Sequence, residues 1–358
     1  MAGGNEPFSI AIDAMGGDHA PASVVEGALA YVQGQGRGSL LLVGDQPEVE
    51  RELARLSAPR DAFQIVHAPD TVGMGEAAAT AVRRKPNSSI AVCARLAKDG
   101  EAAAIVSAGN TGAAVAACQL RLRPLKAVDR PAIATWVPTR SGGCVLLDVG
   151  ANSDCKPTHM VQFAVMGAVY AEHILGRKEP RVGLLNIGEE SSKGNELAQA
   201  SYPLLAQQSG FHFVGNVEGR DIFRGAADVV VCDGFTGNVV LKFSESVVEL
   251  LTMILRREIH HDLRSRAGGL LLQPAFRRFR RQLDYAEYGG APLLGINGVC
   301  IIAHGSSSPK AIKNAIRVAA EFVDHRINEL IAAAIATVKL DSGAEEGAAG
   351  PAVEEAHG

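Results

Sequence analysis

The sequence predicts a three-layer α/β/α fold around a mostly parallel sheet, and three observations support this fold class. Short runs of Val, Ile and Leu alternate along the chain with Ala-rich stretches of helical periodicity. These apolar runs are nearly continuous, which is typical of strands buried on both faces. Each run ends in glycine and small polar residues, as strands do where they turn into helices. With 358 residues, of which 47% are hydrophobic, the chain can bury such a sheet.

The expected elements follow from these runs in chain order. The first strand ends at Asp13, just before a Gly-Gly-Asp-His turn. Six further strands are expected at residues 40–43, 103–106, 145–149, 182–187, 229–232 and 299–303. Asn110 or Thr111 is expected to cap the Ala-rich helix after the third strand, and Ser308 to cap a helix with Pro309 in its first turn.

We expect a single catalytic domain over residues 8–340, with flexible tails at residues 1–7 and 341–358. An excursion over residues 246–288 interrupts the strand–helix alternation. It is predicted to begin as a helix, break at Gly268-Gly269, and continue as a short Arg-rich helix. Residues 255–283 carry a net charge of +6, whereas the rest of the chain carries −10. The excursion therefore differs from the body in charge as well as in pattern.

The Arg-rich excursion is open to three interpretations. It forms a solvated helix face, docks an acidic protein, or presses leucines into a bilayer while arginines meet anionic lipid. Exposed leucines beside clustered cations make the first the weakest of the three. The expected membrane or carrier-protein contacts are Leu270, Leu271, Leu272, Phe276, Arg277, Arg278, Arg280 and Arg281. A nucleic-acid role is not expected, because the patch has few stacking aromatics and the protein is acidic overall.

Several protein classes lack support in the sequence. The six cysteines are scattered without a C-x-x-C pair, which indicates reduced thiols in the cytoplasm. Neither a signal peptide nor an apolar run of roughly 20 residues is present, so we expect neither export nor a membrane span. The G-x-G-x-x-G, Walker A, H-E-x-x-H and G-x-S-x-G motifs are also missing. An enzyme with this sequence is expected to use no cofactor, no metal and no covalent Ser or Cys.

Polar residues gather where the predicted strands end. Besides the first strand, such ends occur at residues 107–112, 148–152, 186–190, 233–238 and 304–308. Any one of them is adequately explained as a glycine turn with a helix cap. Six of them on one sheet edge would instead form an anion site, because glycine lets the backbone approach a ligand and helices begin with free N–H groups. We expect all six to converge at that edge.

Lys193 is the cation expected to meet an anionic substrate. It lies in a polar stretch, residues 186–196, at the mouth of a strand. The alternative is a solvated loop lysine paired with Glu189 or Glu190, and the sequence leaves both open.

Taken together, the motifs resemble the PlsX family of phosphate acyltransferases over nearly the whole chain. The matching segments are residues 10–21, 107–113, 147–154, 185–190, 230–238, 284–295 and 304–308. The resemblance implies a fold similar to isocitrate and isopropylmalate dehydrogenases and a homodimer attached peripherally to the inner face of the membrane. It also implies acyl transfer from acyl carrier protein to inorganic phosphate. The acyl phosphate would then serve a membrane acyltransferase in phospholipid synthesis.

The resemblance and the residues together give a set of site candidates. The expected catalytic residues are Lys193, Asn152, Asn186, His304, Asp13 and Asp233. The expected substrate or phosphate ligands are Gly16, Gly17, Asn110, Thr111, Asn195, Thr236, Asn238, Ser306 and Ser307. Backbone N–H groups or Lys193 would stabilise the oxyanion. Asp13 and Asp233 either position a donor, or polarise His304, or simply cap turns.

Three rival functions remain open from the sequence. A decarboxylating NAD-dependent hydroxyacid dehydrogenase is possible because residues 304–309 are similar to the adenine-binding loop of that family. A phosphotransacetylase would use coenzyme A thioesters instead of carrier-protein thioesters. A non-catalytic membrane scaffold would need the arginines but not the strand-end residues.

Overall fold

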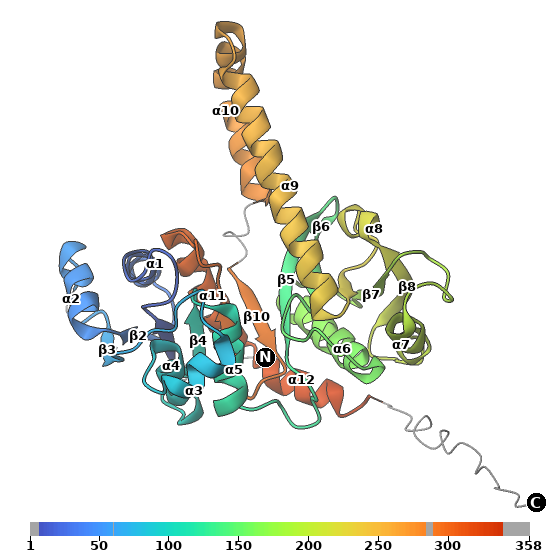
Figure 1. Cartoon of the computed structure of the whole chain (residues 1–358), viewed down its shortest axis with the longest axis horizontal. Helices are drawn as coiled ribbons and strands as arrows, with labels where there is room; N and C mark the ends of the chain where they lie inside the picture. Colours follow the sequence, from blue (N-terminus) through green and yellow to red (C-terminus); the bar gives the residue numbers. More distant parts are fainter. Residues whose placement is uncertain (1–6, 60, 284–288, 339–358) are drawn as a thin grey trace, which may run out of the picture.

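The computed structural model describes residues 7–59, 61–283 and 289–338, which form one eleven-stranded sheet covered by helices (Figure 1). Across the sheet the order is β3 (Gln64–His67), β2 (Ser39–Gly44), β1 (Ser9–Asp13), β4 (Ala104–Ser107), β11 (Val299–Ile302), β10 (Ala291–Leu294), β5 (Ala132–Thr139), β6 (Gly142–Leu147), β9 (Val229–Val231), β7 (Arg181–Asn186) and β8 (His212–Glu218). Most neighbours pair in parallel, which confirms the mostly parallel sheet.

Two strands in the middle of the sheet change its direction. β10 pairs antiparallel with both β11 and β5, and β5 pairs antiparallel with β6. The strands β1, β2, β3, β4 and β11 therefore run one way, and β6, β7, β8 and β9 run the opposite way. The sheet thus has two halves, joined through this central antiparallel region. We call β1, β2, β3, β4 and β11 the N-terminal half, although β11 comes late in the chain, and β6, β7, β8 and β9 the C-terminal half.

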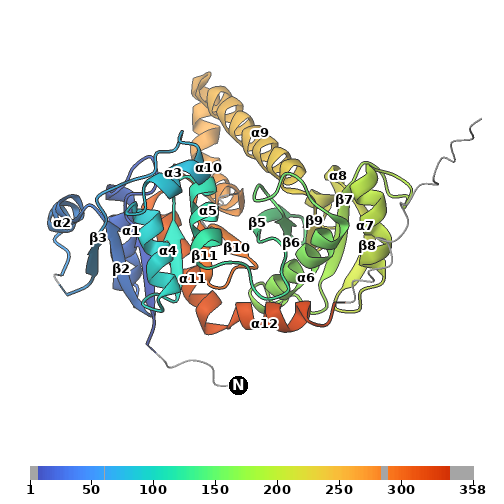
Figure 2. The same cartoon turned by 60° about the horizontal axis from the view of Figure 1, so that its bottom comes forward.

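Helices cover both faces because both faces of the strands are apolar. Along β1, Ile10 and Ile12 belong to one buried cluster and Ala11 to the other, as the two-residue period of a strand requires. The first cluster includes residues of α1 (Ala22–Gln33), α2 (Gln46–Arg55), α6 (Pro157–His173), α7 (Glu196–Ala206), α11 (Pro309–Asp324) and α12 (Ile327–Ile335). The second includes residues of α3 (Ala78–Arg84), α4 (Ser89–Lys98), α5 (Thr111–Arg121) and α8 (Gly219–Arg224). These are the three predicted layers (Figure 2).

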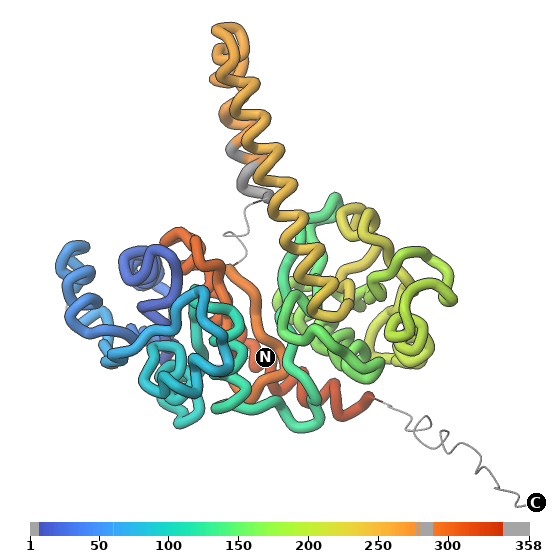
Figure 3. Tube along the Cα trace, viewed as in Figure 1, coloured from blue at the N-terminus to red at the C-terminus, as the bar shows by residue number. Residues whose placement is uncertain are grey.

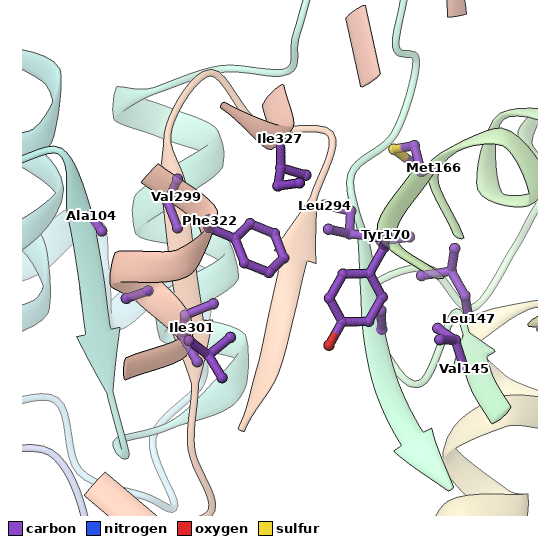
Figure 4. Packing of buried hydrophobic residues seen from close by; sticks show 14 of the residues in the cluster. Ala104, Val145, Leu147, Met166, Tyr170, Leu294, Val299, Ile301, Phe322 and Ile327 are labelled. Carbon is purple, nitrogen blue, oxygen red and sulfur yellow. The ribbon is translucent and has the colours of Figure 1, made fainter. Parts of the chain in front are cut away.

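The hydrophobic core continues from one half of the sheet into the other. α6 packs on β6 and β9 of the C-terminal half, and α11 packs on β4 and β11 of the N-terminal half. Where these helices meet, the rings of Tyr170 and Phe322 lie 5.5 Å apart, and Ile327 of α12 belongs to the same cluster (Figure 4). The two halves therefore share one buried layer.

A helical hairpin projects from the body (Figure 3). It consists of α9 (Gly234–His260) and α10 (Leu263–Leu283), so it begins earlier than the predicted excursion. The predicted break at Gly268-Gly269 is wrong, since α10 continues through both glycines. A Cβ added at Gly269 would lie 2.5 Å from Ile259 Cγ2, so this glycine allows α9 and α10 to approach each other.

The seven predicted strands are confirmed, but β3, β5, β8 and β10 were not expected. β5 and β10 contain Pro138 and Pro292, and proline argues against a strand in sequence-based reasoning. Antiparallel pairing places both prolines in the sheet all the same. The tails at residues 1–6 and 341–358, and the end of the excursion at residues 284–288, lie outside the described residues.

Candidate functional site

Asp13 lies buried at the carboxyl end of β1. Its Oδ2 accepts a 2.6 Å hydrogen bond from Ser107 Oγ at the end of β4. In the described part of the chain, Oδ1 has no partner of hydrogen-bonding geometry. Burial raises the pKa of this carboxyl group above its ordinary value, although the Ser107 and Ser89 hydroxyls and the Met15 and Gly16 amides partly oppose the shift.

Asp13 contributes to a pocket in the N-terminal half of the sheet, and we call it the Asp13 pocket. The pocket is small, and the space in it measures about 210 Å³ only when the open solvent at its mouth is included. Its walls are formed by Asp13, Gly16, Thr71, Val72, Ser89, Ile90, Ser107, Gly109, Asn110 and Ala113. A Cβ at Gly16 would lie 2.7 Å from both Asp13 Oδ2 and the Gly109 nitrogen, so only glycine fits there. The backbone thus approaches the pocket closely, as expected at a ligand site.

The side chain of Asn110 already forms hydrogen bonds with backbone groups of the protein. Its Oδ1 accepts from the Ala113 amide at 3.0 Å, which confirms it as the cap of α5. Its Nδ2 donates to the carbonyls of Gly73, Met74 and Glu76. Asn110 therefore holds the 71–77 loop at the Asp13 pocket, and any phosphate contact here would come from backbone N–H groups and from the exposed Thr111.

The loop after β11 lies against the loop after β1. The Asp18 amide donates to the Gly305 carbonyl at 2.8 Å, and Gly17, with φ of 116°, allows this close approach. His304 Nδ1 lies 2.8 Å from Ser306 Oγ and accepts from the Ser306 amide. Ser307 Oγ is buried and has no hydrogen-bond partner among the described residues. Asp13 and the loop of His304, Ser306 and Ser307 thus lie at the ends of β1 and β11, the two strands on either side of β4.

Asp148 organises the corresponding strand end in the C-terminal half. Its two oxygens accept from the amides of Ile133, Gly150, Ala151 and Asn152 and from Asn152 Nδ2, at 2.8 to 3.2 Å. Asn152 Nδ2 also donates to the Pro131 carbonyl. The side chain of Asn152 therefore holds backbone in place.

Asp233 is the N-cap of α9. Its Oδ1 accepts from the Thr236 amide and its Oδ2 from the Thr236 hydroxyl, at 2.8 and 2.7 Å. The structure thus shows the capping alternative for this residue. Asn238 follows on the first turns of α9, exposed and beside Gly150, which leaves its side chain available to a ligand.

The loop after β7 presents Lys193 to solvent. Asn186 Nδ2 donates to the Lys193 carbonyl and Asn186 Oδ1 accepts from the Ile187 amide, so Asn186 fixes both ends of the loop. Asn195 caps α7 by accepting from the Ala198 amide. Among the described residues Lys193 forms no ion pair, so the predicted alternative of pairing with a neighbouring glutamate is absent there.

The expectation that all six strand ends lie on one sheet edge is wrong. β6, β7 and β9 run opposite to β1, β4 and β11, because the central strands β10 and β5 reverse the sheet. The site candidates therefore fall into one group in each half.

Reasoning from the sequence did not select some important residues. Asp148 lies inside a recognised motif, and its position directly after a buried strand was a usable signal. Ser89 and the 71–77 loop carried no such signal, because only tertiary packing brings them to Asp13.

The cysteines are free thiols, and burial raises the pKa of Cys144 to about 12, so it is not a reactive thiolate. In the described ranges no three His, Cys, Asp or Glu side chains gather as a metal site, and metal-free chemistry stays a prediction.

The expected contact residues all lie on α10. Leu270, Leu271 and Leu272 are exposed, at 72%, 84% and 53%. Phe276 is half-buried and Arg278 exposed, whereas the side chains of Arg277, Arg280 and Arg281 lie outside the described residues. Of the helices that the structure describes, none is both long and apolar enough to cross a bilayer.

Comparisons with known proteins agree with this architecture. A family model described as "Fatty acid synthesis protein" matches residues 8–330. The chain is 52% identical to a phosphate acyltransferase of Pelotomaculum thermopropionicum over 97% of this chain and 99% of that protein. It is 54% identical to one from Heliobacterium modesticaldum over 88% and 93%. The EutD phosphotransacetylase of Staphylococcus aureus shares the fold, with a TM-score of 0.59, 15% identity, and coverage of 88% and 94%. The chain therefore belongs to the fatty acid synthesis protein family, in which these relatives are phosphate acyltransferases.

Proposed function

We propose that this protein is an acyltransferase that moves a fatty acyl group from acyl carrier protein to inorganic phosphate, giving acyl phosphate for phospholipid synthesis. The observation that carries the proposal is the Asp13 pocket, where close backbone, the N-terminus of α5 and a buried carboxyl group surround a small space. Such a space suits a compact oxyanion that both accepts and donates hydrogen bonds. The family relationship supplies the reaction class.

The chemistry requires positioning and charge stabilisation. A phosphate oxygen attacks the thioester carbonyl carbon, the C–S bond breaks, and sulfur leaves as a thiolate that takes up the proton given up by phosphate. A thiol is a good leaving group, and phosphate is already an anionic nucleophile near neutral pH. The N-terminal half would bind phosphate, with Ser306 and Ser307 nearby. Lys193 and Asn238 of the C-terminal half would meet the acyl donor, which would span both halves.

The hairpin supports the partners that we propose: acyl carrier protein, an anionic lipid surface and a second copy of the chain. Its α10 helix combines exposed leucines with arginines, and this combination suits both an acidic carrier protein and an anionic lipid surface. Exposed apolar side chains along α9, such as Leu250 and Leu251, leave room for a second copy of the chain, consistent with a homodimer. We place the protein in the cytoplasm, at the inner face of the membrane, where a membrane acyltransferase could accept the product.

Thiol release from a long-chain acyl carrier protein tests the proposed function. Purified protein treated with chelator should release thiol only when inorganic phosphate is present, and hydroxylamine should trap the product as a hydroxamate. Coenzyme A thioesters serve as the comparison donor and distinguish a phosphotransacetylase. Release that is independent of phosphate, or no release, would contradict the proposal. The family comparison does not favour the dehydrogenase or the scaffold, which predict nicotinamide reduction and no catalysis, respectively.

Replacing Leu270 and Leu271 together by glutamine should weaken binding to vesicles containing anionic phospholipid by roughly 100-fold or more. The two side chains are exposed, and burial of each leucine in lipid contributes roughly 1.5–3 kcal/mol. Vesicle co-sedimentation measures the change. Leu120→Gln is the matched control, because Leu120 is exposed on α5, away from the hairpin. Equal vesicle binding by the double variant and the wild type would exclude this face as the lipid contact.

A further inference from the structure

Asp13 Oδ1 is a buried hydrogen-bond acceptor for which the described part of the protein supplies no donor of hydrogen-bonding geometry. The residue is 3% exposed, and Oδ1 lacks a partner although Oδ2 is bound to Ser107. A buried polar atom left unpaired costs free energy, so such atoms usually face a ligand or water. Asp13 lines the pocket next to the first turn of α5.

The lining of the Asp13 pocket restricts what such a ligand can be. A carboxylate requires a partner that donates a hydrogen bond. The first turn of α5 requires the opposite, because amides such as those of Thr111 and Gly112 have no acceptor within the helix. None of the ten lining residues carries a cationic side chain. A fully deprotonated dianion would therefore face the Asp13 carboxylate without a compensating charge.

We propose that Asp13 binds the nucleophilic phosphate by accepting its O–H, and thereby selects hydrogen phosphate over sulfate. Hydrogen phosphate has one O–H to donate to Asp13 and further oxygens to accept from the α5 amides. Sulfate has the same shape and charge but no proton near neutral pH, so it would leave the carboxylate unpaired and repelled. The inference rests on the proposed function and adds a specificity-determining residue to it.

The discrimination should depend on pH in a defined direction. Ser89 of α4, Ser107 of β4 and the backbone face Asp13, and the titratable neighbours are Cys93 of α4 and Cys300 of β11. Burial raises the pKa of the Cys93 thiol, and the hydrogen bond with Cys118 together with burial raises the pKa of the Cys300 thiol, so both stay neutral. Burial also raises the pKa of Asp13. Below that pKa the neutral acid can donate to sulfate, whereas above it the carboxylate rejects sulfate, so discrimination increases with pH.

The titration of Asp13 also changes the free energy of unfolding, and this change identifies the pH range for the binding experiment. The folded state binds the Asp13 proton more tightly than the unfolded state, because its pKa is raised on folding. The contribution of Asp13 to stability is therefore complete at low pH and is lost as pH rises through the folded pKa. The free energy of unfolding of the wild type, measured relative to Asp13→Asn, should fall over that pH interval. The binding experiment belongs above it.

Equilibrium dialysis of radiolabelled inorganic phosphate against the full-length protein tests the proposal. Sodium sulfate is the competitor, and sodium chloride holds ionic strength constant. With the wild type, sulfate should displace phosphate at least roughly 10-fold less effectively than unlabelled phosphate does, which is the size of one hydrogen bond to a charged group. In Asp13→Asn the amide donates equally to both anions, so this difference should disappear. Asp45→Asn is the matched control, because Asp45 caps α2 by accepting from the Glu48 amide and asparagine caps equally well.

The outcomes test the role of Asp13 and the proposed function separately. Equal displacement by sulfate and phosphate from the wild type, retained discrimination in Asp13→Asn, or no phosphate binding would overturn the role of Asp13. Selective phosphate binding without thiol release from acyl carrier protein would leave this proposal standing and remove the proposed function. Thiol release without sulfate discrimination would do the reverse.

Discussion

Replacing Lys193 by alanine is expected to lower the turnover number roughly 100-fold or more, with folding and the KM for phosphate little changed. Removing one preorganised stabiliser of an oxyanion costs about 100- to 1,000-fold in rate. Lys193 suits that role because it is exposed, on a loop whose ends Asn186 holds. Thiol release from acyl carrier protein at saturating phosphate measures the effect.

Two further variants make this prediction specific. Lys98→Ala removes an exposed lysine from the end of α4 and should leave turnover unchanged. Lys193→Arg keeps the charge but changes its shape, so it should retain part of the activity. If Lys193→Ala turned over at the wild-type rate, the loop after β7 would have a structural role only. A rise in the KM for phosphate alone would move Lys193 from the acyl donor to the phosphate site.

Asp148→Ala is expected to lower the free energy of unfolding by about 4 kcal/mol or more. Asp148 is fully buried and accepts hydrogen bonds from four amides and one side-chain nitrogen. Each buried donor left unpaired costs roughly 1–3 kcal/mol, and alanine leaves the buried amides of Ile133 and Asn152 unpaired. Urea denaturation followed by circular dichroism measures the change.

The neighbouring Asp154 provides the control for this second prediction. It lies exposed in the same loop, so Asp154→Ala should change the free energy of unfolding by less than about 0.5 kcal/mol. Asp148→Asn should be intermediate, because the amide oxygen still accepts while the Nδ2 group faces further donors. A loss below about 1 kcal/mol for Asp148→Ala would show that water replaces the carboxylate and that the loop does not depend on it.

Local signals in the sequence predicted much of the fold. The cap Ser308 was identified, and the cap of α5 was narrowed to Asn110 or Thr111, because these residues precede helices in a recognisable pattern. Asn110 and Ser308 each accept the expected backbone amide. The seven predicted strands were found because each is a short run of apolar residues. The hairpin break at Gly268-Gly269 was wrong, because a glycine signals a turn in the sequence but here serves close packing against Ile259.

The candidate site was predicted less completely than the fold. The sequence offered Asp13, Lys193 and the strand-end glycines as candidates, and their chemical roles stay predictions. It could not show that Asn110 and Asn152 use their side chains to hold backbone, because hydrogen-bond partners far along the chain decide that. Nor could it show which buried atoms stay unpaired.

The sequence by itself determined the α/β/α class, the parallel strands, the helix caps and the residue types at the strand ends. These depend on periodicity and on contacts within a few residues. Only the tertiary structure decided that β10 and β5 reverse the sheet, that the site candidates divide between its two halves, and that Asp13 Oδ1 has no hydrogen-bond partner among the described residues. Those features depend on pairing between distant segments, and no local pattern encodes such pairing.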